Sequence, residues 1–282
     1  MLDKINARIG FMQGRLTKPK DKLIQSFPFE NWKNEFSNGR KLGFGNIVFL
    51  FDDYRCEENP LSTDKGLVEL QNICEKTGMN IASISVDYFM HKPFTASKKQ
   101  ADENIEILKK LILKAKILKI PLIEIPLLDN SSINNTGYKD LIISKINTVL
   151  PFATQNDVKL AFETDLPPKR FLAFIKKFDA KSVGIVYDSG NSAFSGYNPA
   201  EELALFGKYI TNVHIKDRIL NGHSVELGQG GTDFDALFKA LRTINYSGKF
   251  ILQVARGNDG EEEKTLVKQR NFVVSLIEKY LI

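Results

Sequence analysis

Four polar residues stand where four successive apolar runs end in the second half of this chain. They are Glu163, Asp188, His214 and Gln253. Short apolar runs between helical segments are typical of parallel strands that are buried on both faces. A polar side chain at the end of such a strand reaches the rim on which α/β barrels build their sites. Two carboxylates, an imidazole and an amide form an oxygen-and-nitrogen set that suits a divalent metal ion.

Eight short apolar runs recur along the chain and would position these four residues. We expect strands at residues 9–12, 47–51, 81–86, 122–125, 160–162, 183–187, 210–215 and 250–254. Apolar residues at helical spacing lie between them, as in Ile105, Leu108, Ile112 and Ala115. Eight strand-helix units in order predict an α/β fold, a single (β/α)8 TIM barrel that takes residues 1–282 as one domain. The competing doubly wound sheet is disfavoured because no Gly-x-Gly-x-x-Gly follows the first run.

Several helix starts are also marked in the sequence. Asn198 is a cap residue followed by a first-turn proline and by the acidic Glu201. Thr232 is expected to cap a later helix in the same way, and the pair Pro167-Pro168 is expected to open another. Helices at these places would separate the last four strands.

Composition limits the classes of function. The chain has 282 residues, of which 43% are hydrophobic, and a net charge of +5 from 39 basic and 34 acidic side chains. This basic excess is mild and spread along the chain, so we expect no nucleic-acid partner. Neither a membrane span nor a signal core is evident, and the two cysteines have no ligand spacing. We therefore expect a cytoplasmic protein without a membrane partner.

Five motifs carry a resemblance to a known family. They are the segments 9–16 (IGFMQGRL), 162–165 (FETD), 187–191 (YDSGN), 213–218 (VHIKDR) and 227–230 (LGQG). By their order and spacing the chain resembles the xylose isomerase-like TIM barrel superfamily, the group of sugar phosphate isomerases and epimerases and of endonuclease IV. The resemblance runs over nearly the whole chain. It implies a small-molecule sugar or sugar phosphate as substrate and allows a homo-oligomer, since relatives often form dimers or tetramers.

The resemblance also implies a metal site. Sugar isomerases and epimerases of this family hold one divalent ion with a Glu, an Asp, a His and a second Glu. Glu163, Asp188 and His214 would take the first three places and Gln253 the fourth, around Mn, Mg, Co or Zn. The amide oxygen of Gln253 can still bind a hard ion, but it brings one negative charge less, which should weaken affinity.

The chemistry gives the site residues roles. Isomerising a sugar removes a proton beside a carbonyl, and Glu163 can act as the general base. Gln253 cannot transfer a proton, so the two-Glu mechanism of the family's epimerases is in question here. A one-base aldose–ketose isomerisation remains open, as does epimerisation with another catalytic group, for which Asp87, Glu124 and Lys216 are candidates near strand ends.

Other polar residues at strand ends could bind substrate. Arg15, Arg218 and Arg256 would suit a phosphorylated or acidic sugar, although each could instead pair with an acid of the rim such as Asp217. Asp87 and Asn191 are further candidates for substrate binding, while Asn191 could equally serve a turn with Gly190. The glycine-rich segment 227–231 could hold a phosphate on its amides, but we favour a tight turn.

Three other functions compete with the isomerase or epimerase. A lyase or dehydratase of the same fold would share the metal and the proton abstraction. A binding protein that lost the reaction would explain Gln253. A phosphodiesterase like endonuclease IV is disfavoured because its three-zinc site needs many histidines and this chain has three.

Overall fold

The barrel strands follow the eight predicted runs closely. The computed structural model describes residues 2–19, 25–134, 137 and 139–282. Its barrel strands are β1 (Ile9–Met12), β2 (Asn46–Leu50), β3 (Asn80–Ser85), β4 (Leu122–Leu127), β5 (Lys159–Thr164), β6 (Val183–Asp188), β7 (Ile210–Ile215) and β10 (Lys249–Leu252). Hydrogen bonds join them in the order β1-β10-β7-β6-β5-β4-β3-β2 into a closed barrel. The predicted (β/α)8 fold is therefore confirmed.

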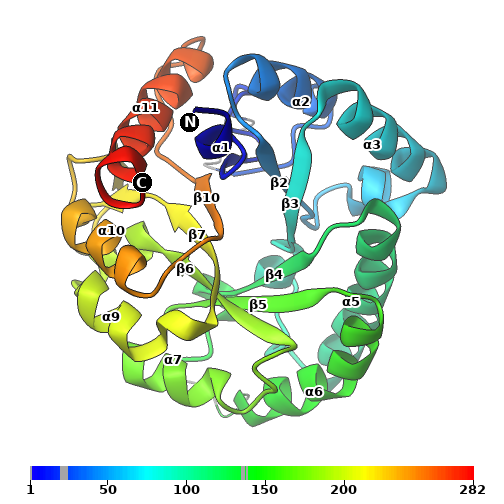
Figure 1. Cartoon of the computed structure of the whole chain (residues 1–282). Helices are drawn as coiled ribbons and strands as arrows, with labels where there is room; N and C mark the ends of the chain where they lie inside the picture. The colour runs from blue at the N-terminus through cyan, green and yellow to red at the C-terminus, as the bar shows by residue number, and fades with distance from the viewer. Residues whose placement is uncertain (1, 20–24, 135–136, 138) are drawn as a thin grey trace. The chain divides into compact units, whose positions relative to one another are not determined.

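Helices separate the strands along the chain (Figure 1). The α-helices are α1 (Leu2–Asn6), α2 (Trp32–Lys41), α3 (Asp64–Thr77), α4 (Tyr88–His91), α5 (Lys98–Leu118), α6 (Lys139–Gln155), α7 (Pro168–Ile175), α8 (Ser189–Phe194), α9 (Pro199–Phe206), α10 (Phe234–Thr243) and α11 (Glu262–Tyr280). Short 3-10 helices are η2 (Cys56–Glu58), η3 (Pro60–Ser62), η4 (Asp129–Ser131) and η5 (Gly207–Tyr209). A two-stranded antiparallel ribbon, β8 (Asp217–Arg218) and β9 (Ser224–Val225), follows β7. Among the described helices, none combines the length and apolarity that a membrane crossing requires.

Two of the three predicted helix starts are confirmed and one is wrong. Asn198 caps α9, since its Oδ1 accepts hydrogen bonds from the N–H groups of the first turn, and α7 begins at Pro168. The cap of α10 is Asp233, whose Oδ1 accepts from the Ala236 N–H at 2.8 Å, rather than Thr232. The Thr232 hydroxyl instead lies 3.3 Å from the carbonyl oxygens of Ser189 and Lys216.

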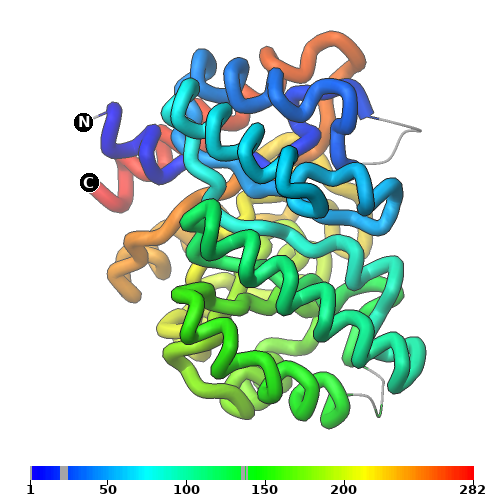
Figure 2. The backbone as a smooth tube through the Cα atoms, turned by 90° about the vertical axis from the view of Figure 1, so that its right-hand side faces the viewer, coloured from blue at the N-terminus to red at the C-terminus, as the bar shows by residue number. Residues whose placement is uncertain are grey.

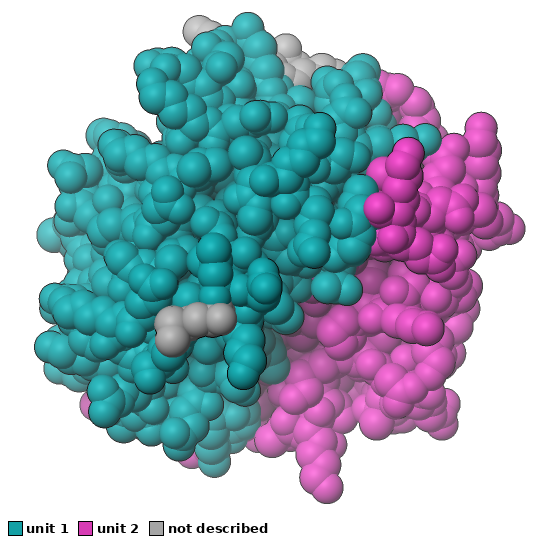
Figure 3. All heavy atoms as spheres, turned by 45° about the horizontal axis from the view of Figure 1, so that its top comes forward, with its two compact units in different colours: residues 1–48, 77–80, 187–282 teal, residues 49–76, 81–186 magenta. Residues whose placement is uncertain are grey.

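Contacts within the chain group it into two compact units, coloured separately in Figure 3. Unit 1 comprises residues 1–48, 77–80 and 187–282, and unit 2 comprises residues 49–76 and 81–186. Within unit 1, α10 packs against both α9 and α11. Within unit 2, α5 and α6 lie side by side (Figure 2). The expectation that the whole chain is one domain stays a prediction.

Aromatic side chains fill the space between strands and helices in each unit. In unit 1 the rings of Phe238 in α10 and Phe250 in β10 stack at 5.4 Å between centroids. In unit 2 Phe162 of β5 packs against Phe174 of α7 with centroids 5.3 Å apart. All four rings are buried, and burial of one such side chain contributes roughly 1.5–3 kcal/mol. This packing fixes the strands whose ends carry the candidate site.

Candidate metal centre

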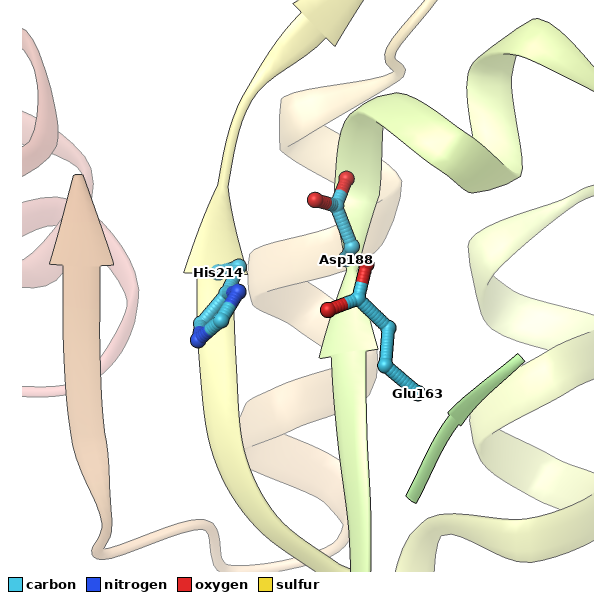
Figure 4. Close-up of side chains that lie close together, drawn as sticks. All are labelled: Glu163, Asp188 and His214. Carbon is cyan, nitrogen blue, oxygen red and sulfur yellow. The ribbon is translucent and has the colours of Figure 1, made fainter. Parts of the chain in front are cut away.

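Glu163, Asp188 and His214 offer one ligand atom each within 4.8 Å of one another, as Figure 4 shows. Glu163 lies near the end of β5, Asp188 is the last residue of β6 and His214 is the fifth residue of β7. All three side chains are buried. Two carboxylates and an imidazole in such an arrangement can hold a divalent cation, because oxygen and nitrogen ligands suit Mg²⁺, Mn²⁺ and Zn²⁺.

Asp188 has two roles, one for each carboxylate oxygen. Its Oδ1 accepts the Asn191 N–H at 2.8 Å and so caps α8. Its Oδ2 is buried and accepts no hydrogen bond from the described residues, but the Nζ atom of Lys216 lies 3.7 Å away. One oxygen of Asp188 thus caps α8, and the other faces the ammonium group of Lys216.

Gln253 follows β10 and lies on the face of the sheet that carries His214. Ile251 is the register partner of His214, and side chains two residues apart on a strand share a face. The Nε2 of Gln253 donates to Oε1 of Gln25 at 3.0 Å. Its Oε1 is buried and has no hydrogen-bond partner among the described residues. An amide oxygen is therefore offered on the histidine face, which fits the predicted fourth ligand.

Lys216 is held from two sides in unit 1. Ser189 Oγ donates to the Lys216 carbonyl at 2.7 Å and lies 3.0 Å from its N–H, which fixes the backbone. The aliphatic stem packs over Gly190, where an added Cβ would lie 2.6 Å from Lys216 Cγ. Only 14% of the Lys216 side chain is exposed. The glycine allows the ammonium group to reach the Asp188 carboxylate.

The side chains of Arg218 and Asn191 are hydrogen-bonded to each other. Arg218 Nη1 donates to Asn191 Oδ1 at 3.1 Å, and Nε and Nη2 both donate to the Gly222 carbonyl. Its guanidinium carbon lies 4.0 Å from the ring centroid of Phe194. These contacts secure the β8–β9 ribbon to α8. The predicted role of both residues in substrate binding stays a prediction.

The carboxylate of Asp217 accepts hydrogen bonds from backbone N–H groups in and directly after the glycine-rich segment 227–231. Its two carboxylate oxygens accept the N–H groups of Gly228, Gly230 and Thr232 at 2.8–3.0 Å. An added Cβ at Gly230 would lie 2.3 Å from Asp217 Oδ1, so the loop approaches too closely for a side chain. Because these amides bind a carboxylate of the protein itself, the turn interpretation is supported over the phosphate-binding one.

Glu35 of α2 organises the loop after β1 and was missed by sequence reasoning. Its carboxylate accepts the N–H groups of Gly14 and Leu16 at 2.8 and 2.9 Å and the Thr17 hydroxyl at 3.1 Å. Burial raises the pKa of Glu35 to about 7, against the opposing effect of these hydrogen bonds and of the charge of Arg256. A signal existed, since Trp32, Glu35, Phe36 and Gly39 form a buried stripe with helical spacing.

Arg15 and Arg256 lie in the same region as Glu35. Arg15 Nε donates to the Val254 carbonyl at 3.0 Å, and Arg256 Nη1 donates to the Thr17 carbonyl at 2.8 Å. Burial lowers the pKa of Arg256, while the neighbouring Glu35 raises it. Both guanidinium groups thus join the loop after β1 to the segment after β10, and their predicted contact with substrate remains untested.

The two remaining candidate acids lie in unit 2 and are hydrogen-bonded to serines. Ser83 Oγ donates to Glu124 Oε1 at 2.6 Å, and Ser85 Oγ donates to Asp87 Oδ1 at 2.8 Å. Glu124 is buried inside β4, whereas Asp87 precedes α4. Their predicted parts in proton transfer and substrate binding stay predictions.

The family model described as a xylose isomerase-like TIM barrel matches residues 36–275. The Haemophilus influenzae protein SgbU, whose name proposes an L-ribulose-5-phosphate 3-epimerase, is 25% identical over 274 residues, which are 88% of this chain and 92% of that protein. Further relatives, two of them named as dehydratases, are matched over only 31–47% of their own length.

Solved structures share the fold. An L-ribulose 3-epimerase superposes with a TM-score of 0.73 at 18% identity, over 97% of this chain and 95% of the other. A xylose isomerase-like TIM barrel protein from Mycobacterium smegmatis in complex with magnesium has a TM-score of 0.71, also at 18% identity, over 98% of both chains. At this identity the likeness establishes the architecture of the chain.

Proposed function

The chain belongs to the xylose isomerase-like TIM barrel family, and we propose that it is a metal-dependent isomerase or epimerase of a sugar or sugar phosphate. The observation that carries this proposal is the convergence of ligand atoms from Glu163, Asp188 and His214 within 4.8 Å. The names of the similar epimerases, including one directed at a 5-phosphate, support the substrate class.

The donor set fits a divalent cation. Glu163, Asp188, His214 and Gln253 would hold it. Asp188 Oδ2 and Gln253 Oε1 accept no hydrogen bond from the described residues, so both atoms could bind the ion. When bound, the ion would supply Lewis acidity that polarises a sugar carbonyl and offsets negative charge developing on its oxygen. The magnesium complex of a structural neighbour supports a hard divalent ion.

Proton transfer would fall to groups of the chain itself. Glu163 would remove the proton from the hydroxyl-bearing carbon beside the carbonyl and return it to the carbonyl carbon, while the hydroxyl proton moves to the former carbonyl oxygen. This is a one-base isomerisation. Lys216 would donate a hydrogen bond to the substrate oxygen as charge develops there, since its ammonium group is buried beside Asp188. Gln253 cannot exchange a proton, so epimerisation would require a second group, with Glu124 and Asp87 as candidates.

Substrate selection would use the cationic groups of the rim. Arg15 and Arg256 bring two guanidinium groups to the segment after β10, where an anionic sugar would gain from them. Asn191, with Arg218 bound to its side-chain oxygen, would orient a substrate hydroxyl through its amide nitrogen. These assignments favour a phosphorylated or acidic sugar over a neutral one.

A dehydratase is the second candidate because two relatives carry that name. The same base would remove the proton beside the carbonyl, and the substrate would then lose a hydroxyl group as water. Loss of 18 mass units from the substrate would identify this outcome.

The test is solvent exchange in deuterated buffer. The protein, purified without chelator and supplied with Mn²⁺, is incubated with a panel of ketoses, ketose phosphates and aldoses. We expect deuterium to enter beside the carbonyl of at least one substrate, and we expect Glu163→Gln to abolish this exchange. Absence of exchange across the panel, with Mn²⁺ shown to be bound, would overturn the proposal and leave a binding protein.

A further inference from the structure

A chain of hydrogen bonds runs from Arg15 through Gln25 to Gln253. Oε1 of Gln25 accepts from Gln253 Nε2 at 3.0 Å and from Arg15 Nη2 at 3.4 Å. Arg15 is in turn anchored by its Nε, which donates to the Val254 carbonyl at 3.0 Å. The four residues come from the loop after β1 and from the segment after β10. This chain of hydrogen bonds, here called the relay, therefore joins two neighbouring strand ends of unit 1.

The chemistry of the three groups fixes the direction of every bond. Arginine carries only donors, so Gln25 must turn its oxygen toward Arg15. An oxygen at that position can bind Gln253 only through the amide nitrogen of Gln253. The Oε1 of Gln253 is therefore turned away from Gln25, and it is buried without a hydrogen-bond partner among the described residues. A buried carbonyl oxygen of this kind costs about 1–3 kcal/mol unless a ligand satisfies it.

The relay suits an amide at position 253 and opposes a carboxylate. A glutamate there would place an acceptor oxygen against Oε1 of Gln25, and two acceptors 3.0 Å apart repel. Relief would require Gln25 to turn its NH2 group toward position 253 and hence toward the donors of Arg15. The surroundings of Gln253 are therefore adapted to a neutral side chain.

We propose that Gln25 is a positioning residue, which Arg15 holds and which aims the Gln253 oxygen at the divalent cation as a neutral fourth ligand. This inference rests on the proposed function, because it requires the cation held by Glu163, Asp188 and His214. The site then carries two carboxylates instead of three, and its residue on β10 takes no part in proton transfer.

The experiment measures Mn²⁺ affinity of the full chain by electron paramagnetic resonance of the free ion. Gln25→Met removes the acceptor at similar volume. We expect it to weaken Mn²⁺ binding by about tenfold or more, because loss of a residue that orients a metal ligand commonly has an effect of this size. Gln25→Glu keeps acceptors for both Arg15 and Gln253, so we expect binding at least as tight as that of the wild type.

A double-mutant cycle makes the assignment specific. Gln253→Met should weaken binding as much as Gln25→Met or more, and Gln25→Met should add nothing once Gln253 is already Met. Wild-type affinity in Gln25→Met, equal losses in Gln25→Met and Gln25→Glu, or additive losses in the double variant would overturn the positioning role. Thermal unfolding in chelator shows whether each variant is folded, and Gln25→Glu provides the comparison if Gln25→Met is not.

The two proposals fail in different ways. If the wild type binds no Mn²⁺, Mg²⁺, Co²⁺ or Zn²⁺, the metal-dependent function and the relay both fall. If the wild type binds Mn²⁺ and catalyses deuterium exchange while Gln25→Met keeps wild-type affinity, only the positioning role of Gln25 is wrong.

Discussion

The ammonium nitrogen of Lys216 lies 3.7 Å from Oδ2 of Asp188, and the side chains of both residues are at most 14% exposed. The lysine therefore stands beside the carboxylate oxygen that would bind a cation. Two positive charges near one carboxylate oxygen repel each other, so Lys216 and a bound divalent ion compete for Asp188. This competition makes the pair measurable through metal-dependent stability.

Lys216→Met should destabilise the metal-free protein and enlarge the stabilising effect of Mn²⁺. Removing the lysine leaves a buried carboxylate without its cation, which costs about 3 kcal/mol, and bound Mn²⁺ restores the missing charge. Thermal unfolding in EDTA and in saturating Mn²⁺ measures both effects. An Mn²⁺-induced rise in Tm no larger than that of the wild type would contradict the competition.

Gly190→Ala should displace Lys216 and lower the rate of deuterium exchange by about tenfold. The added methyl group would lie 2.6–2.9 Å from the Cβ, Cγ and Cδ atoms of Lys216, so the stem must move. A shift of about 1 Å in a catalytic group can cost two orders of magnitude in rate. Single-turnover exchange at saturating substrate checks this, and Gly231→Ala serves as the control, because its methyl group would meet only contacts of 3.5 Å and longer. Equal rates in the two variants would argue against a catalytic Lys216.

Glu35→Gln should flatten the pH dependence of stability between about pH 4.5 and 7. The folded protein raises the pKa of Glu35 from 4.5 to about 7, so folding favours the protonated acid. Stability from this group is greatest below pH 4.5 and falls as the pH rises to 7, by about 3 kcal/mol in total. Urea unfolding at several pH values should show the wild type losing this amount relative to Glu35→Gln. A constant difference between the two proteins would mean that folding does not raise the pKa of Glu35.

Gly230→Ala should destabilise the protein far more than Gly231→Ala. A Cβ at position 230 would lie 2.3 Å from Asp217 Oδ1 and 2.7 Å from the Arg218 carbonyl, whereas position 231 offers ordinary contacts. The crowded methyl group would break the bonds from the loop amides to the buried Asp217, which places the loss at about 3 kcal/mol. Chemical unfolding of the two variants measures this difference. Similar free energies of unfolding would show that the loop can move to accommodate the added methyl group without loss of stability.

Local sequence patterns were sufficient to predict the barrel and the three polar residues that it brings together. Apolar runs of strand length located all eight barrel strands, because a strand buried on both faces must be apolar throughout. Strand-end position then identified Glu163, Asp188 and His214, since parallel strands of a barrel all end at one rim. Helix starts were less certain: Thr232 and Asp233 are both good caps, and only the competing contacts of the Thr232 hydroxyl decide between them.

The sequence alone determined which residues reach the rim, because strand length and alternation are local properties. Only the tertiary structure decided what those residues touch. Gln25 and Gln253 are hydrogen-bonded although they are 228 positions apart in the sequence. The carboxylate of Asp217 accepts hydrogen bonds from backbone N–H groups that lie 11 to 15 residues later in the chain. The partners in such bonds are donors and acceptors that closure of the barrel brings together. Because these residues are far apart in the sequence, no local pattern along the chain predicts their contact.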